Sequence, residues 1–138
     1  MELISPWTPE YTGSGVVYRP LLRAYVICAD AQISFRDFLV DSGADISMAP
    51  RQLATELGLN WTAGEKKTLT GISNRKECRV NARVLQVQLF IRELKQELAI
   101  PMCFANADVP CLLAREGFFD VFQVLFDKRT RRTVIRSF

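Results

Sequence analysis

The chain has 138 residues, of which 49% are hydrophobic and 24% charged, a balance typical of a globular domain and not of a disordered chain. No apolar run approaches the ~20 residues needed to span a membrane. The net charge is +3, yet five of the last eleven residues are basic, which leaves the other residues with a net charge of −2. The chain lacks histidine and its four cysteines form no CxxC pair, which excludes the common Cys/His zinc patterns. We therefore expect no metal and no cofactor.

The beginning of the sequence, MELISPWTPEY, has neither the basic start nor the apolar run of a signal peptide. Widely spaced cysteines fit reduced thiols, so we expect a cytoplasmic protein. Residues 1–19 contain several prolines and glycines and are predicted to form an N-terminal arm or edge strand. Residues 20–138 are predicted to form the single domain.

Apolar alternation predicts that most of this domain is β-strand. The predicted strands cover residues 21–28, 32–40, 78–91, 98–104 and 111–114, followed by a hairpin of 122–126 and 133–135. In the segment 78–91 the apolar positions change parity after Val84, which predicts a bulge or bend. A helix is predicted at 50–57, because proline suits its first turn and Gly58 follows its end, and 115–119 is predicted to form one or two helical turns. The pattern indicates a mainly antiparallel β architecture.

The tetrapeptide Asp41-Ser42-Gly43-Ala44 follows the apolar run 38–40, and Asp-Ser-Gly occurs only once in the chain. Aspartic peptidases need two facing carboxylates, one ionised and one protonated. A chain that carries one such carboxylate can supply the pair only if two copies meet on a two-fold axis. Asp-Ser-Gly is also common in surface turns, but a surface turn seldom follows a buried apolar run. The motif therefore points to a protease and to a homodimer.

Two carboxylates about 3 Å apart share one proton and titrate in coupled steps. The ionised carboxylate would take a proton from a water that attacks the peptide carbonyl, and the protonated one would donate to the developing oxyanion. Ser42 would hydrogen-bond across the two-fold axis. Gly43 would let the backbone pass close to the carboxylates and the substrate.

Four blocks of the sequence resemble the retropepsin-like aspartic protease family, the single-domain dimeric relatives of pepsin. They are the strand that begins at Pro20-Leu21-Leu22, FLVDSGADIS at 38–47, a flap-like segment at 69–72, and CLLAREGFFD at 111–120. The resemblance covers about residues 20–135. It implies a closed antiparallel acid-protease barrel with one or two short helices, and an aspartic endopeptidase that is active as a homodimer on peptide or protein substrates. It implies neither nucleic-acid binding nor a membrane segment.

The resemblance also assigns roles to individual residues. It implies that Asp41, Ser42 and Gly43 are catalytic, that Ala44, Asp45, Gly71, Ile72 and Ser73 bind substrate, and that Leu113, Ala114 and Arg115 support the site. It further implies a buried, bidentate ion pair between Asp45 and Arg115. The two termini, 1–7 and 133–138, are expected to interleave between subunits, as the termini of the family often do.

Two departures from the family pattern leave alternatives open. Ala114 stands where the family usually has glycine, and an extra methyl behind the catalytic loop can shift that loop. The flap segment lacks a glycine-rich tip. A catalytically weak or inactive protease-fold dimer, acting as a peptide-binding or assembly module, is the alternative to an active endopeptidase. A third hypothesis for the function is nucleic-acid binding through the basic tail. For these basic residues we favour a solvated hairpin turn, because no aromatic residues are interleaved with them.

Overall fold

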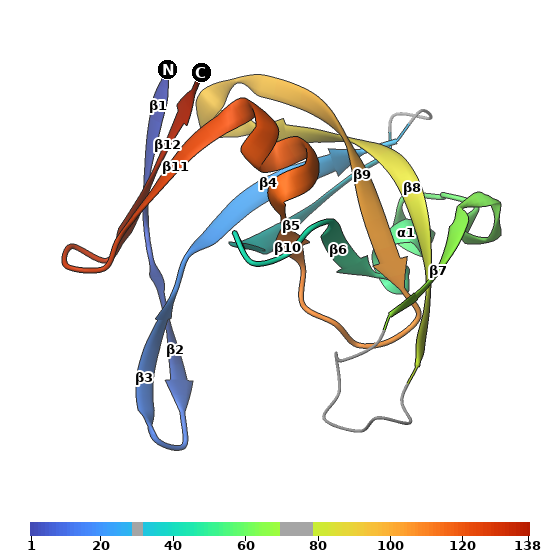
Figure 1. Cartoon of the computed structure of the whole chain (residues 1–138), viewed down its shortest axis with the longest axis horizontal. Helices are drawn as coiled ribbons and strands as arrows, with labels where there is room; N and C mark the ends of the chain where they lie inside the picture. The colour runs from blue at the N-terminus through green and yellow to red at the C-terminus, as the bar shows by residue number, and fades with distance from the viewer. Residues whose placement is uncertain (29–31, 70–78) are drawn as a thin grey trace.

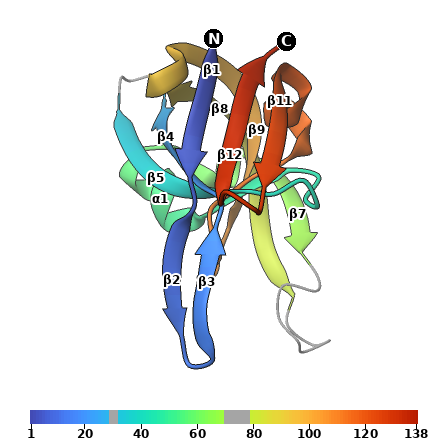
Figure 2. The ribbon, with the colours of Figure 1, turned by 90° about the vertical axis from the view of Figure 1, so that its left-hand side faces the viewer.

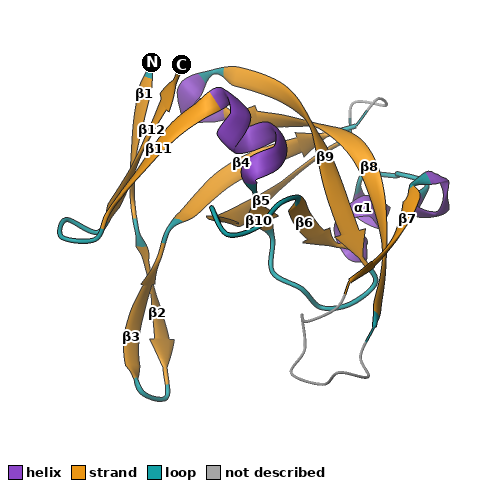
Figure 3. Ribbon diagram, viewed as in Figure 1, coloured by secondary structure: helices purple, strands orange, loops and turns teal. Residues whose placement is uncertain are grey.

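The computed structural model describes residues 1–28, 32–69 and 79–138 (Figure 1). The chain is mainly β with short helices, as the sequence predicted (Figure 3). The strands are β1 (Glu2–Pro6), β2 (Thr8–Thr12), β3 (Gly15–Arg19), β4 (Leu21–Ile27), β5 (Ile33–Val40), β6 (Ser47–Pro50), β7 (Glu65–Leu69), β8 (Val80–Ile91), β9 (Gln96–Ala105), β10 (Leu112–Leu113), β11 (Phe122–Asp127) and β12 (Arg132–Ser137). The α-helix is α1 (Arg51–Glu56), and shorter helical turns cover Trp61–Ala63, Arg92–Leu94 and Arg115–Phe119.

The largest sheet closes on itself. Its strand order is β4-β5-β10-β6-β9-β8-β7, and β4 also pairs with β8, so the strands from β4 to β8 form a ring. Most strand pairs are antiparallel, as predicted, and the β5–β10 and β6–β9 pairs are parallel. Parallel neighbours need a crossover connection, and the long segment between β5 and β10 provides one. This crossover brings β10 alongside β5, the strand directly before Asp41.

The predicted helix is confirmed as α1, with Pro50 directly before it. Leu53, Ala54 and Leu57 are fully buried and share one helix face, as expected. Gly58 has φ +69° and follows the helix end, where a left-handed residue is typical.

The parity change in β8 has a different origin from the predicted bulge. The ladder between β8 and β9 runs without interruption from Ala82 to Ile91, so the bulge prediction is wrong on this side of the strand. The first half of β8 contributes Ala82 to a small hydrophobic cluster with Met48 and Cys103. Its second half contributes Val87, Leu89 and Ile91 to the main core. Because successive side chains alternate between the two faces of a strand, serving two clusters requires the change of parity.

A second sheet brings the two ends of the chain together. Its order is β1-β12-β11, with all neighbours antiparallel, and Figure 2 shows the N- and C-termini side by side at one end of it. Residues 2–6 pair with 132–136 of the same chain, and the expected interleaving of the termini between subunits stays a prediction. Next to this sheet, β2 and β3 form a hairpin that projects from the body (Figure 2). In the described part of the chain, no helix is long and apolar enough to cross a membrane.

Candidate active site

Asp41 directly follows β5, and β10 fixes the end of that strand. Leu113 lies opposite Val40 in the parallel β5–β10 pair. The Asp41 N–H donates to the Leu113 carbonyl at 2.9 Å, and the Leu39 N–H donates to the Cys111 carbonyl at 2.8 Å. Leu113 is fully buried, so the backbone that carries the Asp41 carboxylate is attached to the core.

The loop after β5 orients the carboxylate of Asp41. The Gly43 N–H donates to Asp41 Oδ1 at 2.9 Å, and the Ala44 N–H donates to the Asp41 carbonyl at 3.4 Å. A Cβ at position 43 would lie 3.2 Å from Asp41 Oδ1, tighter than ordinary van der Waals contact, so glycine suits this position. Asp41 is half-buried, whereas Ser42 and Gly43 are exposed. The carboxylate is therefore held in place while the tip of the loop remains open to another molecule.

The Ala44-Asp45 segment is attached to the turn Arg115–Phe119 by backbone and side-chain bonds. The Arg115 N–H donates to the Ala44 carbonyl at 3.1 Å, and the Glu116 N–H donates to the Asp45 carbonyl at 3.0 Å. The Arg115 guanidinium donates to the Ala44 carbonyl from Nε at 3.3 Å and pairs through Nη2 with the Asp45 carboxylate.

The expected ion pair thus forms, but the prediction that it is buried and bidentate is wrong. The side chains of Arg115 and Asp45 are 56% and 88% exposed, and only one guanidinium nitrogen binds the carboxylate, because Nε is bonded to the Ala44 carbonyl. Exposed pairs contribute about 0–1 kcal/mol. The backbone bonds therefore hold the loop against the turn, and the carboxylate of Asp45 remains accessible to solvent.

Ala114 lies in the core beside the loop, where the family resemblance placed a glycine. Its side chain is fully buried, and its φ and ψ of −115° and −176° are ordinary extended values. An alanine therefore fits here without backbone strain. The Ala114 N–H donates to the hydroxyl of Ser47 at 2.9 Å, and Ser47 is itself fully buried.

Sequence reasoning assigned no role to Ser47 or Gly117, although both belong to the blocks that carried the resemblance. Ser47 is a buried polar residue at the start of β6, followed by the apolar Met48 and Ala49. A serine directly before an apolar strand was the sequence feature from which its buried hydrogen bond could have been predicted. Gly117 has φ +90°, and a Cβ there would lie 2.6 Å from Ile100 Cγ2. Only glycine fits position 117 of the turn Arg115–Phe119.

The remaining predicted site residues, Gly71, Ile72 and Ser73, lie outside the described residues. The strands on either side of them pair with each other: Leu69 is opposite Val80, and Glu65 is opposite Val84. Cys111, whose carbonyl binds Leu39, is half-buried, and burial raises the pKa of its thiol. A thiol with a raised pKa is a poor nucleophile, so the reactive candidate beside this loop is the Asp41 carboxylate.

No protein-family model matches the chain, and no curated protein matches it in sequence. Among solved structures, it is similar to a retropepsin-like aspartic protease from Rickettsia conorii, with a TM-score of 0.67 over 97% of this chain and 98% of that chain. The chain has the retropepsin-like fold. Sequence identity in that superposition is 16%. A second structure, EIAV protease in complex with the inhibitor HBY-793, covers 70% of this chain and 82% of its own, at 22% identity and a TM-score of 0.48.

Within the retropepsin-like fold of this chain, the predicted site residues divide into two groups. Residues 41–45 and residues 113–115 come together through the hydrogen bonds of the β5–β10 pair and the adjacent turn. Gly71, Ile72 and Ser73 lie outside the described residues, between β7 and β8, which pair with each other. Among the described residues, no group of three or more His, Cys, Asp or Glu side chains is arranged to hold a metal ion.

Proposed function

We propose that the chain is an aspartic endopeptidase that is active as a homodimer, with one Asp41 from each subunit. The observation that carries the proposal is the held carboxylate of Asp41. It accepts a hydrogen bond from the Gly43 N–H at the end of a strand fixed by β10, in a chain with the retropepsin-like fold. One chain supplies one Asp-Ser-Gly loop, and the chemistry of aspartic peptidases needs two carboxylates.

In the proposed dimer the two Asp41 carboxylates share one proton, because two adjacent carboxylates cannot both ionise. The ionised carboxylate removes a proton from a water held between them, and the water oxygen attacks the carbonyl carbon of the substrate. The protonated carboxyl donates its proton to the carbonyl oxygen, which gives a tetrahedral diol. The diol then collapses, the C–N bond breaks, and the leaving amine takes up a proton from the pair of carboxylates.

Several features of the loop support this role. Because Gly43 N–H binds Oδ1, the carboxylate has a fixed orientation before substrate arrives, which reduces the reorganisation needed in the transition state. The exposed position of Ser42 suits a hydrogen bond to the partner subunit across the two-fold axis. The accessible carboxylate of Asp45 suits an N–H of the substrate backbone. Substrate binding by residues 71–73 and a cytoplasmic location stay predictions.

The alternative, a weak or inactive dimer that acts as a peptide-binding or assembly module, was motivated by Ala114 and by the glycine-poor flap, which lies outside the described residues. The φ and ψ of Ala114 are ordinary extended values and its side chain lies in the core, so its backbone carries no strain. Ala114 therefore gives no reason to prefer the inactive form, and the activity measurement below distinguishes the two.

The test measures the oligomeric state of the chain and its peptidase activity together. Sedimentation equilibrium of the purified chain measures the monomer–dimer equilibrium, and cleavage of a quenched fluorescent peptide library is measured at the same concentrations. We expect the rate per chain to rise with the dimer fraction and to be highest on the acid side of neutral, because the pair must retain one proton. A strict monomer that cleaves peptides, or a rate that increases steadily up to pH 9, would contradict the proposal.

A further inference from the structure

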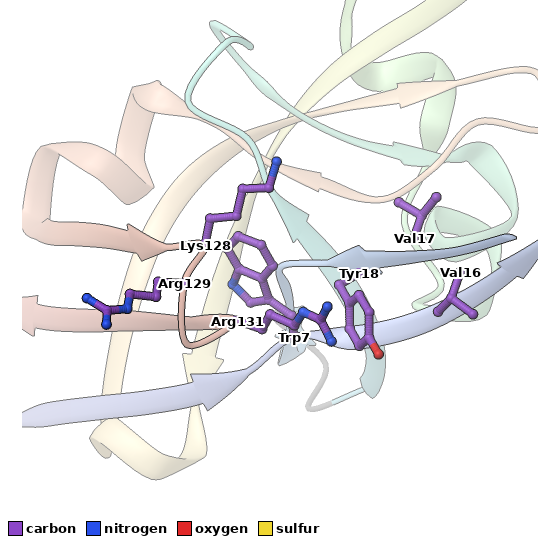
Figure 4. Close-up of a pocket in the computed structure, with 7 residues that line it drawn as sticks. All are labelled: Trp7, Val16, Val17, Tyr18, Lys128, Arg129 and Arg131. Carbon is purple, nitrogen blue, oxygen red and sulfur yellow. The ribbon is translucent and has the colours of Figure 1, made fainter.

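A cleft of about 630 Å³ lies between β3, together with Trp7, and the turn that joins β11 to β12. Figure 4 shows the residues that line it: Trp7, Val16, Val17, Tyr18, Lys128, Arg129 and Arg131. None of them belongs to the Asp41 loop or to the turn Arg115–Phe119. The cleft is thus separate in composition from the candidate active site, and its volume is within the range of small-ligand sites, roughly 300–1,000 Å³.

The aromatic side chains of the cleft are fixed by contacts between distant parts of the chain. The Trp7 backbone N–H donates to the Arg131 carbonyl at 2.8 Å, and its indole N–H donates to Thr133 Oγ1 at 2.9 Å. The guanidinium carbon of Arg131 lies 3.8 Å from the centre of the Tyr18 ring, a cation–π contact. Both rings are therefore held beside the basic turn before any ligand arrives.

The charge of the cleft is positive. Lys128, Arg129 and Arg131 are exposed, and none of the three forms an ion pair with another described residue. The nearest acidic residue in the turn, Asp127, uses its carboxylate within the turn: it accepts the N–H groups of Arg129 at 3.1 Å and Thr130 at 3.3 Å.

The acidic residue of the hairpin is also engaged. Glu10 pairs with Arg19 at 2.8 Å. The cleft therefore presents cations to a ligand, with the neighbouring carboxylates already bonded to groups of the chain.

We propose that this cleft binds single-stranded nucleic acid, with a base against the rings of Trp7 and Tyr18 and the phosphates on the basic turn. Sites for single strands combine a cationic groove with aromatic side chains on which bases stack, and the cleft holds both. An acidic peptide would use the cations but would gain nothing from the flat rings, so we favour the nucleic acid. The basic tail by itself indicated a solvated turn, because the aromatic residues that complete the site come from the other end of the chain.

The first experiment measures binding of a fluorescently labelled twelve-nucleotide oligothymidylate by anisotropy at two salt concentrations. We expect binding at 50 mM NaCl that weakens strongly at 200 mM, because phosphate contacts release counterions. The double variant Lys128→Gln/Arg129→Gln should lose about tenfold or more in affinity, through the loss of two phosphate contacts. The matched control Arg92→Gln/Lys95→Gln removes two exposed charges from the turn between β8 and β9 and should bind like the parent. An equal loss in both variants, or no binding at 50 mM NaCl, would overturn the proposal.

A second experiment tests whether a base reaches the ring of Trp7. The chain has two tryptophans, so Trp61→Phe leaves Trp7 as the only indole, and we expect its fluorescence to be quenched by saturating oligonucleotide. Binding without quenching would overturn the stacking arrangement. Competition by poly-glutamate as effective as that by unlabelled oligonucleotide would also overturn the proposal, since the cleft would then take acidic peptides. Because the proposal does not depend on peptidase activity, Asp41→Asn should bind the oligonucleotide like the parent.

Discussion

The hydroxyl of Ser47 accepts a hydrogen bond from the backbone N–H of Ala114 at 2.9 Å, and both residues are fully buried. This bond connects the start of β6, which follows the Asp41 loop, to the end of β10, which supports that loop. If a buried N–H loses its acceptor, the cost of removing it from water is no longer offset by a hydrogen bond, and the folded protein becomes less stable. The connection is therefore important for the stability of the candidate site, although neither side chain is a chemical group of the proposed reaction.

Ser47→Ala should destabilise the protein by about 1–3 kcal/mol, because the Ala114 N–H would be left buried without a partner. The free energy of unfolding from urea titration measures this loss. Ser137→Ala is the control: Ser137 is exposed on β12, and its loss should change stability by less than about 0.5 kcal/mol. Equal effects of the two variants would show that the buried hydrogen bond does not contribute to stability.

Ala114→Gly should reduce stability and leave turnover per folded dimer unchanged. Removing a buried methyl costs about 0.8 kcal/mol, and the added freedom of the unfolded chain costs about 0.4–1 kcal/mol more. Ala107 is exposed and supplies the control, since Ala107→Gly should lower stability only through the added freedom of the unfolded chain. Turnover is measured with active sites titrated by a tight inhibitor. A several-fold increase in turnover would show instead that the methyl displaces the Asp41 loop.

Gly117→Ala should be among the most destabilising single changes in the chain. The residue has φ +90°, and the new Cβ would lie 2.6 Å from Ile100 Cγ2, so backbone strain of about 1–3 kcal/mol adds to overpacking of about 1–3 kcal/mol. Gly13→Ala is the control, because a Cβ at that position meets nothing within 4 Å. If thermal unfolding of the two variants coincided, the steric argument for position 117 would be wrong.

Asp41→Asn should abolish peptide cleavage while leaving the fold intact. The amide oxygen of asparagine can still accept the Gly43 N–H, but it cannot take the proton of the attacking water. Asp37→Asn is a matched control on β5, the strand before Asp41: Asp37 is exposed and pairs with Arg23 at 3.1 Å, so activity should persist. Peptide cleavage and far-UV circular dichroism of both variants decide the question. Cleavage by Asp41→Asn at the parental rate would refute the assignment of the catalytic residue.

A double-mutant cycle of Asp45→Ala and Arg115→Ala should give a coupling of about 0–1 kcal/mol, since both side chains are largely exposed. The coupling should fall further at 1 M NaCl, where exposed charges are screened. Urea titrations of the four proteins supply the values. A coupling of 3 kcal/mol or more would be typical of a buried pair and would contradict the exposed arrangement.

The sequence by itself determined those features that depend on local pattern. Apolar alternation predicted the strands, and Pro50 and Gly58 marked the ends of the helix α1. The order of the four blocks indicated the retropepsin-like fold, and the apolar run before Asp41 distinguished its loop from an ordinary surface turn. These features are readable because strand alternation, helix ends and turns depend on neighbouring residues.

Only the tertiary structure decided which residues meet across long separations in the chain. It showed that β8 serves two hydrophobic clusters without a bulge, that the Asp45–Arg115 pair is exposed, and that the termini pair within the chain. It also placed Trp7 and Tyr18 beside the basic turn of residues 127–131. The physical reason is that burial, and the partner available to each polar group, depend on packing between segments far apart in sequence, which local patterns do not encode.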